Sequence, residues 1–260
     1  MIGPQLSRRS FHRLVAGNLL AVGLANFMHG TATADDQGVE SLDRWFQDYR
    51  KLGEQLARGV IRQDAWQDGM ARLYQAVSIP ALMERIDYKR LVDKISGSDL
   101  GNRGEVFHTL MMSGDGSEVG SGPEPPKVLI TKLAFIKKGR SVPPHGHSNM
   151  VSAFLNISGE FHVRQYDKLA DQDDALVVRP TDDTICGAGT WSSISDVRNN
   201  VHWITAKSDD CFMFTSKMIE LTDDRPFHGR MNIDVLRASD LGNGRLSAHK
   251  ISAAQAAELY

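Results

Sequence analysis

Apolar side chains recur every three or four positions between residues 41 and 95, with charged residues between them. This spacing is typical of amphipathic helices. The first run contains Leu42, Trp45, Phe46, Tyr49, Leu52 and Leu56, and the second contains Trp66, Met70, Leu73, Tyr74 and Val77. Pro80 interrupts the pattern, and the stretch from residue 81 to 92 predicts a further helix. We expect Trp45, Trp66 and Tyr74 to belong to the core, because they lie on the apolar stripes.

Beyond residue 127 the pattern changes to short apolar runs rich in β-branched residues, which predict strands. These runs cover residues 128–136, 151–155, 160–166, 175–178, 202–205 and 211–219. Turn signals such as Lys138-Gly139, Ser158-Gly159 and 187–189 separate them. Residues 113–126 are rich in Gly, Ser, Pro and Glu and predict a loop, whereas residues 253–259 predict a short helix. Many short strands with such turns favour a mainly β sandwich or barrel.

The chain has 260 residues and a net charge of −2, which suits one sizeable domain with additions. No basic patch interleaved with aromatic residues indicates a nucleic acid partner. We divide the chain into a leader (1–34), a helical N-terminal segment (35–103), a β domain (104–222) and a C-terminal extension (223–260).

The leader has the order of an export signal. Arg8-Arg9 precedes a weakly apolar run from Leu14 to Met28, and small residues follow up to Ala34. The paired arginines match a twin-arginine signal, so we expect the export machinery of that route as a partner and a periplasmic or exported mature chain cleaved after Ala34. The apolar run is too short and too interrupted to span a membrane, and we expect no integral membrane segment in the mature chain.

One short motif carries the clearest chemistry, the sequence Pro143-Pro144-His145-Gly146-His147. On an extended backbone His145 and His147 point to the same side, because strand side chains alternate with a period of two. Two imidazoles held in this way are half of a metal site.

The residues around this pair resemble the first motif of the cupin superfamily. Gly139 lies six positions before His145, and Gly159 follows the pair after a short gap. The resemblance covers roughly residues 128–219. It implies a double-stranded β-helix, that is, a jelly-roll barrel with one metal at its mouth, and it makes His202 the third ligand. Three imidazoles would leave the other side of the metal open for substrate and oxygen.

The sequence departs from the superfamily in one respect that bears on the metal. No Glu lies between His147 and Gly159, and Ser152 stands about where that carboxylate would be. This argues against cupins with a three-His-plus-Glu site, such as oxalate-degrading manganese enzymes. A neutral three-histidine site leaves the metal its full charge, which favours anionic ligands such as thiolate or carboxylate.

Within the cupins, the runs 145–150 and 159–167 look most like the thiol dioxygenases of the cysteamine dioxygenase and plant cysteine oxidase type. Those proteins share Met150 after the pair, the later Gly-x-x-His-Val-basic-x-Tyr-Asp, and Asn200 two residues before the third histidine. Their Pro-Gly after the second histidine is replaced by Ser148-Asn149, and their two glycines before the Asn are replaced by Arg198-Asn199.

Further residues follow from strand alternation. His162, Arg164 and Tyr166 share one face of a strand. If that face points inward, His162 supports the ligands from behind, Arg164 anchors an anion and Tyr166 donates to substrate. The opposite face carries Phe161 and Val163, which would suit the core and would turn Arg164 toward solvent. Ser152 and Asn200 complete the set of residues expected to support the ligands.

Our preferred hypothesis is an exported mononuclear metal cupin, a dioxygenase-like oxidoreductase acting on a small polar or thiol substrate. The expected metal is Fe(II), with Mn, Ni or Zn as alternatives. Rival hypotheses are a cupin isomerase or lyase, a non-catalytic periplasmic small-ligand-binding protein, and a β domain without metal. Cupins often form homodimers through their sheets. Cys186 and Cys211 are compatible with a disulfide or with two free thiols.

Overall fold

The structure is a computed structural model that describes residues 36–96, 105–110 and 129–260. The export signal expected at residues 1–34, its cleavage after Ala34 and the loop expected at 113–126 lie outside these residues. In the part of the chain that is described, no helix has the length and apolar character needed to cross a membrane.

Helices form the N-terminal part, as the three- and four-residue spacing predicts, although residues 81–92 belong to two helices separated at Asp87 (φ 51°) and not to one. They are α2 (Asp36–Ala57), α3 (Gln63–Ala76), α4 (Ile79–Arg85) and α5 (Tyr88–Ser96). Pro80 lies in the first turn of α4, where the missing N–H costs nothing, and the Ser78 side chain caps that helix by accepting from the Ala81 N–H. Pro80 therefore begins a helix instead of only ending one.

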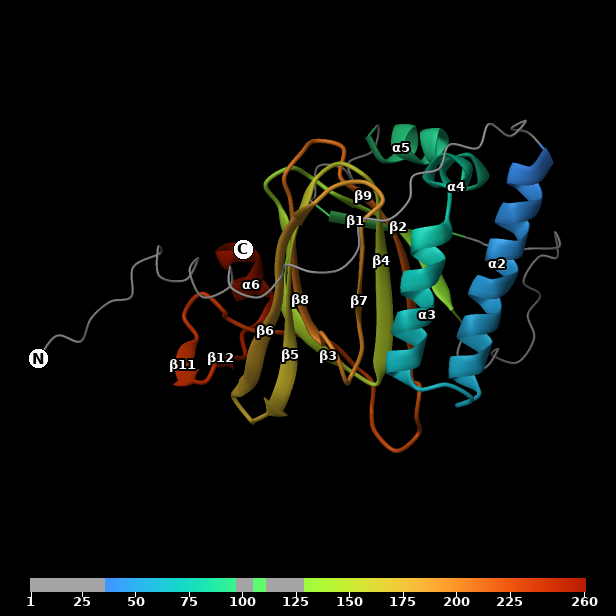
Figure 1. Ribbon diagram of the computed structural model, residues 1–260. Coiled ribbons are helices and arrows are strands. Elements are labelled where there is room, and N and C mark those ends of the chain that lie inside the picture. Colours follow the sequence, from blue (N-terminus) through green and yellow to red (C-terminus); the bar gives the residue numbers. More distant parts are fainter. Residues whose placement is uncertain (1–35, 97–104, 111–128) are drawn as a thin grey trace, which may run out of the picture. The chain divides into compact units, whose positions relative to one another are not determined.

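The strands form two antiparallel sheets (Figure 1). The five-stranded sheet has the order β1-β2-β9-β4-β7, and the seven-stranded sheet has the order β10-β3-β8-β5-β6-β12-β11. The first sheet consists of β1 (Glu105–Thr109), β2 (Ile130–Ile136), β9 (Phe212–Ile219), β4 (Met150–Ser158) and β7 (Trp191–Ile194). The second consists of β10 (His228–Asn232), β3 (Ser141–Ser148), β8 (Val201–Ala206), β5 (Phe161–Asp171), β6 (Ala175–Cys186), β12 (Arg245–His249) and β11 (Ser239–Gly242).

The strand order identifies a jelly roll. From β2 to β9 the chain changes sheet at every step except between β5 and β6, which form a hairpin. The eight strands then lie in the orders β2-β9-β4-β7 and β3-β8-β5-β6, which is the pattern of two interleaved Greek keys. The predicted fold class, a mainly β jelly roll with a helical N-terminal segment, is confirmed. Residues 223–260 add three strands and the helix α6 (Ala253–Leu259).

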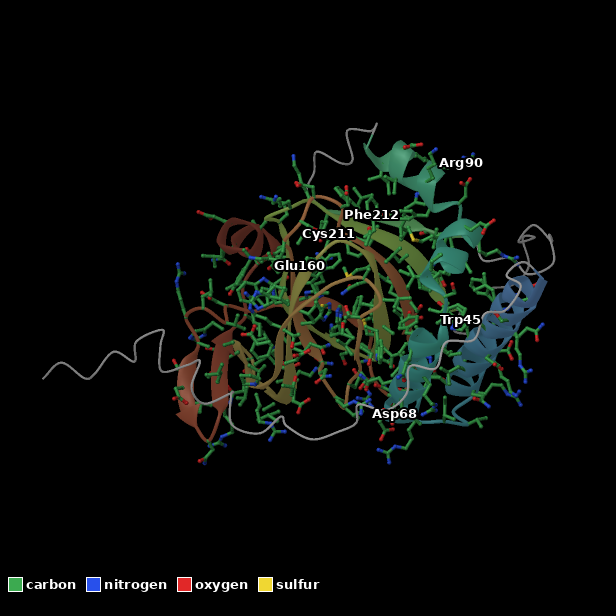
Figure 2. All side chains as sticks on the ribbon, turned by 45° about the horizontal axis from the view of Figure 1, so that its top comes forward. Trp45, Asp68, Arg90, Glu160, Cys211 and Phe212 are labelled. Carbon is green, nitrogen blue, oxygen red and sulfur yellow. The ribbon has the colours of Figure 1, made fainter. Side chains whose placement is uncertain are left out.

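Alternation along the strands separates three apolar clusters. The outer face of the five-stranded sheet packs against the helices, and this cluster contains Trp45, Trp66 and Tyr74 as expected (Figure 2 labels Trp45). The space between the two sheets holds a second cluster, which includes Phe161, Val163 and Ile204. A third cluster lies on the outer face of the seven-stranded sheet, under residues of the C-terminal segment.

A buried hydroxyl network ties the helices to the five-stranded sheet. The Tyr49 hydroxyl is hydrogen-bonded to Ser216 Oγ at 2.6 Å and to Thr131 Oγ1 at 2.8 Å, and the Tyr74 hydroxyl is 2.8 Å from Ser216 Oγ. These polar groups are satisfied inside an apolar layer, so the network fixes how α2 and α3 dock.

Both cysteines are free thiols in the structure. Cys211 is buried beside Glu160, and its thiol donates to the Glu160 carbonyl at 3.1 Å (Figure 2). Cys186 accepts instead from the Asn156 side chain at 3.2 Å. Of the two alternatives that the sequence leaves open, the structure has the free thiols.

Candidate metal centre

Two neighbouring strands of the seven-stranded sheet bring three histidines together. His145 and His147 lie on β3, and His202 lies on β8 directly opposite His145. Their ligand nitrogens all lie within 4.8 Å of one another, and the residues are only 2%, 7% and 4% exposed. The cluster that the sequence predicts is therefore present, and it could hold a metal ion.

The local sequence explains how β3 presents this pair. The pairing of β3 with β8 shifts register between Val142 and His145, where Pro143 and Pro144 cannot donate to the ladder. The Pro143 carbonyl oxygen instead lies 2.7 Å from Nδ1 of His145, two residues further along the same strand. The irregularity thus interrupts the pairing of β3 with β8 and also orients the His145 imidazole.

Backbone carbonyls fix the orientation of two of the rings. Nδ1 of His145 lies 2.7 Å from the Pro143 carbonyl, and Nδ1 of His147 lies 2.9 Å from the Gly229 carbonyl. A carbonyl can only accept, so both Nδ1 atoms carry the proton and both Nε2 atoms keep a free lone pair. Nδ1 of His202 is buried and has no hydrogen-bond partner among the described residues.

The environment keeps all three imidazoles neutral. Burial lowers the pKa of His145 well below 6.5, and the neighbouring His202 and His147 lower it further. Burial lowers the pKa of His147 to about 4, against the opposing effect of the Gly229 hydrogen bond. The pKa of His202 also falls well below 6.5, first through burial and then through His147, although the Asn200 backbone opposes the shift. Neutral imidazole is the form that binds metals.

Asn200 and Gly146 hold the pair in place from the side facing away from the cluster. Asn200 Oδ1 accepts from the His147 backbone N–H at 3.1 Å, and its Nδ2 donates to the Ser195 carbonyl at 2.9 Å. A Cβ on Gly146 would lie 3.0 Å from Asn200 Oδ1, so only glycine fits between the two histidines without displacing that side chain. Asn200 thus orients the backbone of a candidate ligand.

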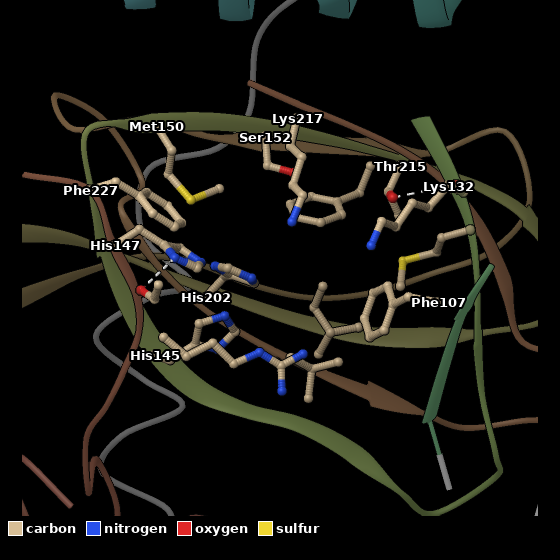
Figure 3. Close-up of a pocket in the computed structure, with 16 residues that line it drawn as sticks. Phe107, Lys132, His145, His147, Met150, Ser152, His202, Thr215, Lys217 and Phe227 are labelled. Atoms are coloured by element: carbon tan, nitrogen blue, oxygen red, sulfur yellow. Dashed lines mark hydrogen bonds between the residues drawn. The ribbon is translucent and has the colours of Figure 1, made fainter. Parts of the chain in front are cut away.

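The histidines open onto a cavity of about 250 Å³ between the sheets (Figure 3). Its apolar lining includes Phe107, Met150, Phe154 and Phe227. Ser152 also lines the cavity and donates to the Ser216 carbonyl at 3.1 Å. No Asp or Glu of the described ranges lines this cavity, which agrees with the absence of the cupin Glu from the sequence.

The structure corrects the roles expected for His162, Arg164 and Tyr166. In the register of β5 with β8, Arg164 pairs with Trp203 and the next residue, Gln165, pairs with His202. Arg164 and its two alternate neighbours therefore lie on the outer face of the sheet, away from the cluster. The expectation that Arg164 and Tyr166 are catalytic and that His162 supports the ligands is wrong.

These outer residues have partners of their own. The Arg164 guanidinium lies 3.8 Å from the Trp203 ring centre and donates to His162 Nδ1, and His162 Nε2 is hydrogen-bonded to Asp183. Tyr166 is buried in the cluster beneath the C-terminal segment. The C-terminal segment covers this outer face, so Arg164 does not extend freely into solvent.

Sequence reasoning missed three cations that line the cavity, namely Lys132, Lys217 and Arg230. Lys132 and Lys217 project from the inner face of the five-stranded sheet into the hollow that the imidazoles face (Figure 3). The signal of Lys132 and Lys217 in the sequence is a single lysine inside a mostly apolar strand. A charge at such a position must lie in a cavity or be paired.

Comparisons with known proteins give only distant similarities. No family model and no curated protein matches the chain. One solved structure similar to part of it is KdgF from Halomonas sp., with 13% identity over 47% of this chain and 84% of that chain and a TM-score of 0.31. Another is a cupin superfamily protein from Desulfitobacterium hafniense, with 14% identity over 44% of this chain and 77% of that chain and a TM-score of 0.28. A third is the Schizosaccharomyces pombe Cnp3 cupin domain, with 10% identity over 44% of this chain and 64% of that chain and a TM-score of 0.31. Because these similarities are weak, the fold assignment rests on the strand order.

Proposed function

We propose that this protein binds one metal ion through His145, His147 and His202 and acts as a dioxygenase-like oxidoreductase on a small polar or thiol substrate. The observation that carries the proposal is the convergence of three buried, neutral imidazoles on a cavity without a lining carboxylate. The expected ion is Fe(II), with Mn, Ni and Zn as alternatives.

The residues fit such an ion in three respects. Imidazole nitrogen is a ligand for iron, zinc and nickel, and two of the rings are held with Nε2 unprotonated. The carbonyls that accept from Nδ1 are the usual outer partners of metal-binding histidines. Nδ1 of His202 is buried and makes no hydrogen bond of ordinary geometry among the described residues, although the Asn200 backbone interacts with the ring.

A bound ion would supply Lewis acidity and, for iron, redox chemistry toward oxygen. The chain itself does the positioning: the Pro143 and Gly229 carbonyls orient two rings, and Asn200 fixes the backbone between them. Met150 and Phe154 cover part of the cavity with apolar surface, which limits the water that reaches the histidines. Three neutral ligands leave room for an anionic substrate group such as a thiolate.

Metal analysis of protein matured in the cell, combined with oxygen uptake on adding small thiols, tests the proposal. We expect one equivalent of iron, and one O₂ consumed per thiol as both oxygen atoms join sulfur to give a sulfinate. His145→Ala and His202→Ala should each lose the metal. His249→Ala provides a matched control, because His249 is exposed on β12. Protein that carries no metal would overturn the proposal.

The same experiment separates the rival functions. Metal with no thiol-dependent oxygen uptake, but with turnover of a carbonyl substrate, would indicate an isomerase or lyase. Function in the cell that survives both histidine substitutions would indicate a non-catalytic binding protein.

We further propose export by the twin-arginine route, which rests on the sequence of residues 1–34 alone. Replacing Arg8 and Arg9 by lysine should retain the protein in the cytoplasm. Fractionation and N-terminal sequencing of the mature protein check this, and a mature chain that still carries the leader would contradict it.

A further inference from the structure

The two sheets contribute side chains of different charge to the cavity. The seven-stranded sheet contributes the three neutral imidazoles, and the five-stranded sheet contributes Lys132 from β2 and Lys217 from β9. Figure 3 shows both ammonium groups pointing into the hollow from the side opposite His145. The cavity therefore has a candidate metal end and a cationic end.

Neither ammonium group has a partner within the described part of the chain. Across the described ranges, the Nζ atoms of Lys132 and Lys217 make no hydrogen bond or ion pair. Burial lowers the pKa of Lys217, and the nearby charges of Lys132 and Arg230 lower it further. Two like charges placed together without an anion are destabilising, so a fold that keeps them there needs another reason for them.

The third cation differs from these two. Arg230 on β10 is paired with Glu105 at 3.0 and 3.5 Å, so its charge is largely compensated. Glu105 itself does not line this cavity. An excess of about two positive charges therefore remains at the lysine end, and no described carboxylate is placed to neutralise it.

We infer that Lys132 and Lys217 bind the carboxylate, or a similar oxyanion, of a small substrate whose other end faces the three histidines. This names the substrate class of the proposed function and rests on it for the histidine end. Thr215, between the lysines on β9 and β2, adds a hydroxyl to the same wall. Ammonium groups bind carboxylate by charge-assisted hydrogen bonds, which are stronger than neutral ones.

The rest of the cavity limits the size and shape of that substrate. Its volume, about 250 Å³, is below the range of drug-sized ligand sites. Phe107, Met150 and Phe154 would contact a short apolar stem between the two polar ends. Among thiols, the charge distribution favours a short thiol carboxylate over an aminothiol, whose ammonium group the two lysines would repel.

Calorimetric titration of the metal-free protein tests the lysine end by itself. Succinate is the probe, and its diamide, which has a similar shape but no charge, is the control ligand. We expect succinate to bind and the diamide not to bind. Lys132→Met and Lys217→Met should each weaken succinate about tenfold, and the double variant about a hundredfold, as expected for one charged hydrogen bond each. Lys217→Arg should retain most of the affinity, and Lys137→Met, at an exposed residue directly after β2, should change nothing.

Folding of the variants is checked by their thermal midpoints. Removing an unpaired, partly buried charge should leave the midpoint unchanged or raise it. Equal binding of succinate by the wild-type protein and the double lysine variant would overturn the inference, and so would equal binding of the diamide.

Failure of this inference and failure of the proposed function give different results. Lysine-dependent succinate binding in a protein that never takes up metal keeps the inference and refutes the metal function. Succinate binding that requires loaded metal and ignores both lysine substitutions refutes the inference and keeps the metal function. With metal present, 3-mercaptopropionate should compete with succinate, whereas cysteamine should not.

Discussion

Substituting Gly146 by alanine should damage the histidine cluster without removing any of its ligands. The added Cβ would lie 3.0 Å from Asn200 Oδ1 and 3.2 Å from both Leu176 Cδ1 and Val201 Cγ2. Leu176 and Val201 belong to the packed cluster on the outer face of the sheet, so they have little room to move. Asn200 must therefore shift, and its hydrogen bond to the His147 N–H weakens.

The cost follows from two terms. Overpacking a filled site costs about 1–3 kcal/mol, and a weakened buried hydrogen bond adds about 1 kcal/mol. We expect Gly146→Ala to lower the free energy of unfolding by about 2–4 kcal/mol in urea titration. Loss of a group that supports a metal ligand typically costs 10–100-fold in affinity, so zinc should bind roughly that much more weakly.

A matched control is Gly187→Ala, because Gly187 lies in a turn where the nearest atom to an added Cβ is 4.0 Å away. That variant should be neutral or slightly more stable. In an Asn200→Ala background the closest clash disappears, so Gly146→Ala should cost less there than in the wild type. Unchanged stability and unchanged zinc affinity of Gly146→Ala would refute this account of the site.

Three other predictions concern residues outside the cluster. Tyr49→Phe removes the hydroxyl that bonds Ser216 and Thr131, and it should lower the free energy of unfolding in urea by about 1–3 kcal/mol, whereas Tyr88→Phe, at a half-buried hydrogen bond, should cost under about 1 kcal/mol. Arg164→Met should leave metal content and succinate affinity unchanged in metal analysis and calorimetry, and a loss of either would return Arg164 to the site. Burial raises the pKa of Tyr49 from 10 to about 12, so the folded state holds a proton that the unfolded state releases, and about 3 kcal/mol of stability should be lost between those pH values. Absorbance at 295 nm during alkaline titration should then show most of the five tyrosines ionising only as the protein unfolds, since the pKa of each is raised.

Periodicity was sufficient for most of the elements and for the pair His145 and His147, whereas His202 was predicted from the resemblance to the cupins. A period of 3.6 placed the helices, and a period of two placed His145 and His147 on one side of β3. The strands of the C-terminal segment escaped prediction because they carry few apolar residues. β11 is exposed along its length, and β10 is mostly exposed. β10 pairs with β3 and β12 pairs with β6, which are far away in the sequence, and a local pattern cannot predict such pairings.

Alternation could not decide which face of β5 points inward. Such a decision needs one polar and one apolar face, but both faces of the seven-stranded sheet are covered, one by the barrel interior and one by the C-terminal segment. Arg164 therefore lies partly buried outside, whereas Phe161 and Val163 lie inside. The same difficulty hid Lys132 and Lys217, because the strands that carry them also bury Thr131 and Ser216 against the helices.

The segments that flank the jelly roll each support one side of the cavity. β10 pairs with β3 so that Asn232 is opposite His145, its Gly229 carbonyl orients His147, and its Arg230 lines the cavity. On the other side, Ser216 binds Tyr49 of α2 and is the neighbour of Lys217, whose side chain takes the opposite face of β9. The eight barrel strands alone would thus keep the three imidazoles but lose a group that orients one of them, and they would lose the helices that back the cationic wall. The histidine end depends on the C-terminal segment and the lysine end on the helical segment, so the site is a property of all three parts of the described chain.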